Sequence, residues 1–162
     1  MYRVKQFIWT ITANFRPIDY GIINKYLTKK EKKLFKKLKL SEQQHSIRVC
    51  NKALQYNLDK SIDKNKLARI ALLHDVGKTS MSLNVVDKSV IVILDKITSG
   101  RLKNSKNRKV DIYYNHPKKS VNLLKGINKY DKEFLEAIEK HHYSDINSNK
   151  YLSIIKECDD VS

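Results

Sequence analysis

The sequence contains few of the residues that break helices or that staple small extracellular domains. Four of its 162 residues are glycine and two are proline, and this scarcity favours helices over a turn-rich β architecture. The two cysteines, Cys50 and Cys158, lie far apart and form neither a CxxC motif nor a disulfide framework. We expect reduced, buried thiols, as is typical of cytoplasmic proteins.

Long hydrophobic runs are also missing. The run VIVIL (90–94) is too short to cross a bilayer, and the apolar part of the N-terminal stretch MYRVKQFIWTITANF is too short for a signal peptide. We therefore expect a cytoplasmic protein with no membrane partner. Hydrophobic residues still make up 41% of the chain, and its length fits one domain with a single core.

Acidic residues are outnumbered by basic ones. The chain has 17 Asp and Glu against 33 Lys and Arg, which gives a formal net charge of +16. Such a field attracts anions, including nucleotides and nucleic acids. A Lys-rich solvated surface is the favoured explanation of the charge, because nucleic-acid contacts favour Arg, of which there are six, and no nucleic-acid-binding motif is present. A nucleic-acid partner stays open.

Hydrophobic periodicity predicts an all-α fold. Capping boxes at Thr28–Glu31 and Ser41–Gln44 mark two helix starts, and Asp63 can cap a third. The apolar segment 83–98 fits a helix or a strand, and its helical neighbours favour a helix, while 99–109 is expected to be a basic loop. Helices are predicted near 2–14, 18–27, 28–38, 41–56, 64–74, 83–98, 110–126, 131–142 and 150–161.

The five histidines occupy helix positions that can converge on the interior. His45 shares a helix face with the apolar residues four and eight positions further on. His74 closes the apolar stripe of its helix, and His141 and His142 close the stripe of theirs. A single inward histidine is usually an ordinary hydrogen-bonded core residue, but their combination indicates a shared site.

Two carboxylates point the same way. Asp75 follows His74 directly, and Asp159 lies on the inward face of the last predicted helix. A buried carboxylate is costly unless it is paired or bound to a cation, and histidine nitrogens with carboxylate oxygens suit Fe, Mn or Zn. His116 precedes Pro117, a residue that fits the first turn of a helix, so we expect His116 at a helix N-terminus.

Five motifs occur in the order QHSIRV, ALLHDVGKT, NHPKKSVNLL, IEKHHY and IIKECDDVS, and span about residues 41–162. This ordered set resembles the HD-domain (HDIG-type) family of metal-dependent phosphohydrolases. The resemblance implies an all-α HD-domain helical bundle with a buried metal centre, and residues 1–40 are expected to form N-terminal helices that pack on it. Cyclic-dinucleotide phosphodiesterases of this family carry Gly-Tyr-Pro after the His-His pair, where this chain has SDINSNKY.

The resemblance also implies two divalent ions, Fe, Mn or Zn, with Mg and Ni as alternatives. The implied ligands of the first ion are His45, His74, Asp75 and Asp159, and those of the second are His116, His141 and His142. Asp75 would bridge the two ions.

The implied activity is hydrolysis of a phosphomonoester or phosphodiester of a nucleotide, a cyclic nucleotide or another phosphorylated small molecule. Two ions about 3.5–4 Å apart would hold a bridging hydroxide that attacks phosphorus, which gives Asp75 a catalytic role. Gly77 would let the chain turn tightly, so that Lys78, the second catalytic candidate, reaches a substrate phosphate. Arg101, in the basic loop, is a further candidate for binding phosphate.

Three other functions fit the same residues less well. A non-catalytic HD module that binds a nucleotide or a protein would not need every ligand type, yet all are present. A mixed-valent di-iron oxygenase uses a similar ligand set, but the adjacent His141 and His142 favour a hydrolase. A nuclease would make use of the net positive charge and would lose binding steeply with salt.

Overall fold

The computed structural model describes residues 17–56, 61–80, 85–143 and 149–162, and every regular element in these ranges is helical. The all-α prediction is therefore confirmed, and the helix predicted near 2–14 lies outside the described residues. The α-helices are α2 (Tyr20–Tyr26), α3 (Lys29–Phe35), α4 (Leu40–Gln55), α5 (Lys64–Leu73), α6 (Val85–Ile97), α7 (Arg108–Lys125), α8 (Lys132–Lys140) and α9 (Lys150–Asp160). There are also two short 3₁₀ helices: η2 (Val76–Ser80) follows α5, and η3 (Arg101–Asn104) lies between α6 and α7.

Helix starts follow their predicted caps with one exception. The Thr28–Glu31 capping box is present at α3, and the Asp63 side chain accepts two backbone N–H groups at the start of α5. The box predicted at Ser41 is wrong, because α4 already begins at Leu40 and takes Lys39 as its N-cap, without a side-chain hydrogen bond. Ser41 therefore lies inside the first turn, where its backbone is already helical.

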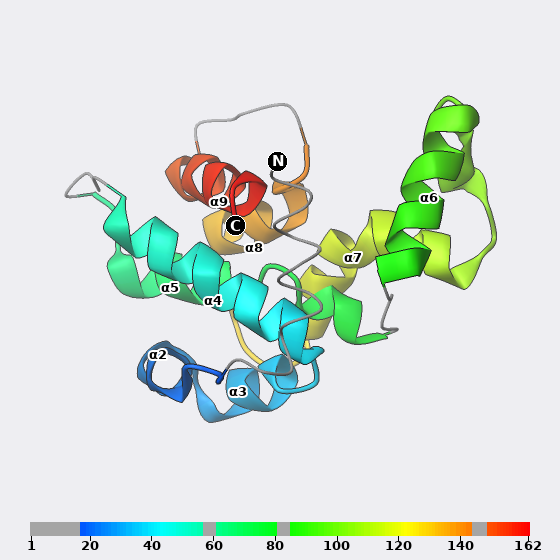
Figure 1. Ribbon diagram of the computed structural model, residues 1–162. Helices are drawn as coiled ribbons and strands as arrows, with labels where there is room; N and C mark the ends of the chain where they lie inside the picture. The colour runs from blue at the N-terminus through cyan, green and yellow to red at the C-terminus, as the bar shows by residue number, and fades with distance from the viewer. Residues whose placement is uncertain (1–16, 57–60, 81–84, 144–148) are drawn as a thin grey trace.

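The core lies among three layers of helices (Figure 1). α4 and α5 pack side by side, with α8 and α9 on one side of the pair and α2 and α3 on the other. The largest fully buried side chains include Phe35 of α3, Leu72 of α5 and Phe134 of α8, so elements from both ends of the chain share one core. The division of the chain near residue 40 stays a prediction.

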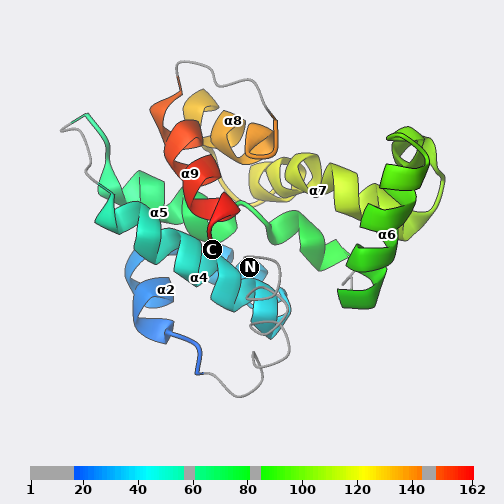
Figure 2. The ribbon, with the colours of Figure 1, turned by 45° about the horizontal axis from the view of Figure 1, so that its top comes forward.

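α6, η3 and the start of α7 form an arm that extends away from this core. Figures 1 and 2 both place α6 at the far end of α7, apart from α4, α5, α8 and α9. The arm has its own small apolar cluster, built on Ile91, Val110 and Ile112. None of the helices in the described ranges combines the length and the hydropathy needed to span a bilayer.

α7 differs from its prediction at its start. It begins at Arg108 and contains Pro117 in its interior, so His116 lies in the middle of a helix and the expected helix N-terminus at this residue is wrong. Asn107 caps the helix with its side chain on Lys109 N–H, and this earlier start shortens the predicted basic loop, which also contains η3.

Candidate metal centre

The segment that follows α5 is held tightly against α7. The Ser120 hydroxyl, on α7, donates to the His74 carbonyl at 2.8 Å and accepts from the Gly77 N–H at 2.7 Å. A Cβ at Gly77 would collide with the backbone carbonyl of His116 and lie 2.7 Å from the backbone nitrogen of Ser120. Because Gly77 has no positive φ, its role is this close approach, and the tight turn expected from the sequence is not what requires glycine here.

Three histidines reach the site with the same tautomer. Nδ1 of His74 lies 2.8 Å from the Ala71 carbonyl, Nδ1 of His141 lies 2.6 Å from the carbonyl of Ile138, and Nδ1 of His116 lies 2.9 Å from the carbonyl of Tyr113. In each case Nδ1–H donates to the backbone oxygen three residues earlier. Each ring therefore directs the lone pair of Nε2 into the interior, as metal-binding histidines do.

These carbonyls are available because the helical hydrogen-bond ladder is interrupted at each of them. His74 and His141 are the C-cap residues of α5 and α8, where the last carbonyls lack helical partners. In α7 the interruption is Pro117, which has no N–H to offer the Tyr113 carbonyl four residues earlier. The proline thus leaves the Tyr113 carbonyl without a helical N–H donor, and this oxygen accepts from Nδ1 of His116 and orients its ring.

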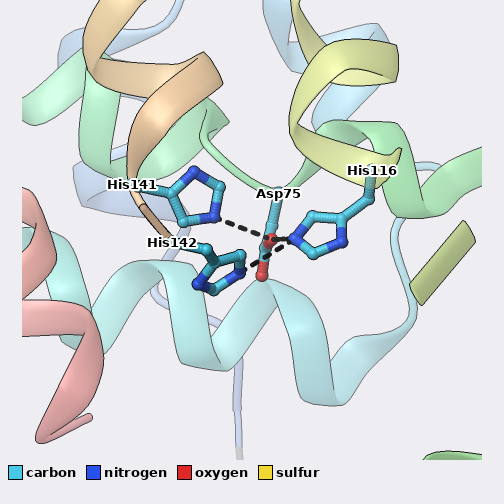
Figure 3. A group of neighbouring side chains, drawn as sticks. All are labelled: Asp75, His116, His141 and His142. Atoms are coloured by element: carbon cyan, nitrogen blue, oxygen red, sulfur yellow. Dashed lines mark hydrogen bonds and ion pairs between the residues drawn. The ribbon is translucent and has the colours of Figure 1, made fainter. Parts of the chain in front are cut away.

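Asp75 lies between two groups of histidines and directs one oxygen to each. Oδ1 lies 3.2 Å from Nε2 of His116 and 3.9 Å from Nε2 of His141, as Figure 3 shows. Oδ2 lies 3.4 Å from Nε2 of His74 and 3.9 Å from Nε2 of His45. The carboxylate therefore has the geometry of a bridge.

The seven candidate ligands form two adjoining groups in which the possible ligand atoms lie within 4.8 Å of one another. One group is Asp75, His116, His141 and His142, and the other is His45, His74 and Asp159. The two groups come close at a second point in addition to Asp75, because Oδ2 of Asp159 lies 3.8 Å from Nδ1 of His142. The structure thus brings together every residue predicted as a ligand, from five segments of the chain.

Among the residues that the structure describes, three buried polar atoms of this cluster find no hydrogen-bond partner: Nε2 of His74, Nε2 of His141 and Oδ1 of Asp75. Leaving such atoms unsatisfied in the interior is costly. All three atoms are directed into the cluster, so a divalent cation that replaced any proton on them would satisfy them together. The residues present therefore fit a metal ion.

The electrostatics of the cluster favour the neutral, metal-binding state at two of its histidines. Burial together with the neighbouring His142 lowers the pKa of His141 well below its usual value, and burial together with His116 lowers the pKa of His142 to about 4. Both rings are therefore neutral at neutral pH, as ligands must be. Burial alone would lower the pKa of His74, but the charges of Asp75 and Asp159 raise it to about 10, which marks a position that favours a cation.

The two predicted phosphate contacts have different surroundings. Nζ of Lys78 lies 2.5 Å from Oδ2 of Asp75 and 3.4 Å from Oε2 of Glu42, so Lys78 adjoins the candidate ligands. Burial alone would raise the pKa of Asp75. The charges of Lys78 and, to a smaller extent, His74 outweigh burial and lower this pKa well below its usual range. Arg101 lies exposed in η3 on the arm, and the structure does not bring it to the cluster.

Two residues of the site were not foreseen. Ser120 fixes the His74–Gly77 segment on α7, and its only sequence signal is that it lies four residues after His116 on the same helix face. Glu42, three residues before His45, contacts Lys78. A glutamate near a helix start is common, so its position alone did not distinguish it.

Comparison with known proteins agrees with this geometry. The family model of the HD domain matches residues 43–162, and the chain belongs to this family. A search of curated proteins and a search of solved structures found no match.

Proposed function

We propose that this chain is a metal-dependent phosphohydrolase that binds two divalent ions and acts on a phosphorylated small molecule, such as a nucleotide. One observation carries the proposal: Asp75 directs its two oxygens to separate histidine groups. A single-ion site would not need a second set of three histidines beyond the bridging carboxylate. Membership of the HD-domain family supports the same class of activity.

Two ions held in this way supply an activated water and neutralise the charge that develops on phosphoryl oxygens. The chain's own residues would do the rest. Asp75 would fix the spacing of the two groups. The backbone carbonyls that accept from Nδ1 of His74, His116 and His141 would fix the orientation of the three rings. The Lys78 ammonium, adjacent to Asp75, would pair with a phosphate oxygen of the substrate.

The first test is the metal content of the purified chain, measured by plasma mass spectrometry without chelator or a histidine tag. Wild type and Asp75→Asn are compared, with Asp111→Asn as the matched control, because Asp111 is an aspartate in a surface ion pair with Lys119. We expect about two ions per wild-type and control chain and a loss of both in Asp75→Asn. A wild type that binds no ion on reconstitution with Fe, Mn or Zn would overturn the proposal.

The second test is turnover of phosphoesters by the reconstituted chain. The panel contains nucleoside monophosphates, cyclic nucleotides and a generic aryl phosphate. Lys78→Met should raise KM for these phosphoesters by a larger factor than it changes the number of ions bound per chain. Oxygen uptake without phosphate release would favour the di-iron oxygenase, and salt-sensitive cleavage of RNA or DNA would favour the nuclease.

A further inference from the structure

α6 exposes an aliphatic stripe on the side turned away from the arm's own core. The exposed fractions are 44% for Val90, 58% for Ile93, 42% for Leu94 and 73% for Ile97. These residues follow the spacing i, i+3, i+4, i+7, so they share one face of the helix, while Ile91 packs into the arm. A contiguous exposed apolar face of this kind marks an interaction site.

Positive charge follows this stripe, from the C-terminal end of α6 to the start of α7. Residues 96–110 contain no Asp or Glu and six basic residues, all exposed: Lys96, Arg101, Lys103, Lys106, Arg108 and Lys109. Of the two carboxylates of α6, one pairs with a residue of this basic group and the other does not. Asp87 pairs with Lys109 at 2.6 Å, and Asp95 is partly buried beside Tyr114, where burial and that carboxylate raise the pKa of the Tyr114 phenol. The arm thus offers an aliphatic face with a basic border.

We propose that the arm, α6 with η3 and the basic segment up to Lys109, docks on an anionic lipid surface, with the aliphatic stripe in the headgroup boundary. The charge pattern disfavours the simplest alternative, because a second copy of the chain would bring two basic borders and two net charges of +16 together. Protein interfaces are enriched in aromatic residues and depleted of Lys. Here the face is purely aliphatic and the border is half Lys or more, which is the pattern of interfacial helices and polybasic lipid contacts.

This proposal departs from the expectation of no membrane partner, which rested on the lack of a long apolar run. A helix that lies in the plane of the interface needs only one apolar face, and the length of the run says nothing about such a helix. The arm is rooted on α7, the helix that also carries His116 (Figure 2). Docking would therefore tether the chain that carries the candidate metal centre to the lipid surface, although the proposal does not depend on the activity of that centre.

The test is co-sedimentation of the full chain with vesicles of phosphatidylcholine alone and of phosphatidylcholine mixed with phosphatidylglycerol. We expect binding to the anionic vesicles that weakens with salt. Two variants separate the contributions: Ile93→Ser/Ile97→Ser keeps the charge, and Lys103→Glu/Lys106→Glu keeps the stripe. Each should weaken the partition coefficient at least ~10-fold.

Matched controls distinguish docking by the arm from adsorption of a basic protein. Lys30→Glu/Lys37→Glu changes the net charge by the same amount at exposed lysines outside the arm. Leu40→Ser/Val161→Ser removes two other exposed aliphatic side chains, which are 43% and 52% exposed. Both controls should bind like wild type. The proposal is overturned if wild type does not bind anionic vesicles, in which case an acidic protein is the better occupant, or if arm and control variants bind equally.

Discussion

The ammonium nitrogen of Lys78 lies 2.5 Å from Oδ2 of Asp75, the oxygen that faces His74 and His45. The same nitrogen lies 3.4 Å from Glu42. Lys78 therefore supplies positive charge to the bridging carboxylate, and Glu42 offers the ammonium a second anion. A divalent ion on Oδ2 would take over the charge that Lys78 now balances, and Lys78 could then turn towards Glu42 or a substrate phosphate.

Replacing Lys78 by Met should destabilise the metal-free chain by about 3 kcal/mol, because a buried carboxylate would lose its charge partner. Added Mn²⁺ should restore more stability to this variant than to wild type, since no ammonium competes for Asp75. Urea unfolding with EDTA and with Mn²⁺ measures both effects. Lys119→Met, which breaks the partly exposed pair with Asp111, is the control and should change stability by less than about 1 kcal/mol in either condition.

Gly77→Ala should destabilise the fold by about 3 kcal/mol, because the added methyl group would collide with the His116 carbonyl and force η2 away from α7. Metal affinity should fall with it, since Asp75 and His116 would separate. Thermal unfolding and Mn²⁺ titration check the two effects. Gly126→Ala is the matched control, as its Cβ would have its nearest contact at 3.4 Å. Equal stability of the two variants would contradict the close approach seen at Gly77.

Because the candidate ligands form two groups, we expect each group to lose its ion independently of the other. His45→Gln alters only the group with His74 and Asp159, and His142→Gln alters only the group with His116 and His141. Each variant should bind about one ion per chain where wild type binds about two. Mass spectrometry of the purified variants gives these numbers, and circular dichroism verifies that they fold. If either variant lost all metal, a single ion shared by both groups would be the better description.

Glu31 of α3 gives the fold a pH dependence outside the metal centre. Its side chain is fully buried and accepts from Arg69 at 2.6 Å, from Tyr130 at 2.8 Å and from the Thr28 N–H at 2.8 Å. Burial would raise the pKa of Glu31, but these hydrogen bonds outweigh it and lower the pKa below its ordinary value of 4.5. A lowered folded-state pKa stabilises the fold above the unfolded-state pKa, and this contribution is lost as the pH falls through the folded-state value.

Glu31→Gln should therefore cost about 2 kcal/mol at neutral pH, and its difference from wild type should shrink as the pH falls below 4.5. Urea unfolding across that range measures the trend. Glu133→Gln, in a half-exposed pair with Lys66, is the control and should shift stability by less than about 1 kcal/mol. If Glu31→Gln lowered the free energy of unfolding by the same amount at every pH, the packing of this side chain, and not its charge, would hold α3 to α5.

Much of the fold could be predicted from the sequence because it is encoded locally. The apolar period that ends at His74 and the caps at Thr28 and Asp63 depend on residues a few positions apart, and the structure confirms the helices they predicted. The convergence of His74 and His141 was predictable for the same reason, since each closes the apolar stripe of its helix and is buried there.

What could not be predicted depends on contacts between distant segments or on the backbone. Gly77 is required by the approach of η2 to α7, where Ser120 lies 43 residues further along the chain, and no local pattern reports such a contact. The carbonyls that orient the histidines carry no side-chain signal at all. His116 was placed at a helix start because Pro117 usually marks one, whereas the interior of α7 accommodates this proline.

That proline yields the most specific prediction. Pro117→Ala would restore an N–H that can bond to the Tyr113 carbonyl, as in any uninterrupted helix. This N–H would compete with Nδ1 of His116, which now lies 2.9 Å from that oxygen. We expect the fold to gain stability, because a proline in a helix interior is unfavourable, while Mn²⁺ affinity falls about tenfold through the loss of the contact that orients the ring.

Opposite changes in stability and in metal affinity distinguish this role from a merely structural one, since a packing defect would lower both. Thermal unfolding of the metal-free chain and calorimetric titration with Mn²⁺ provide the two measurements. The chain offers a matched control in its other proline, because Pro17 is exposed and precedes α2. Pro17→Ala should leave the metal affinity unchanged. If Pro117→Ala also left it unchanged, the Tyr113 carbonyl would be serving both donors, and the proline would not be needed to orient His116.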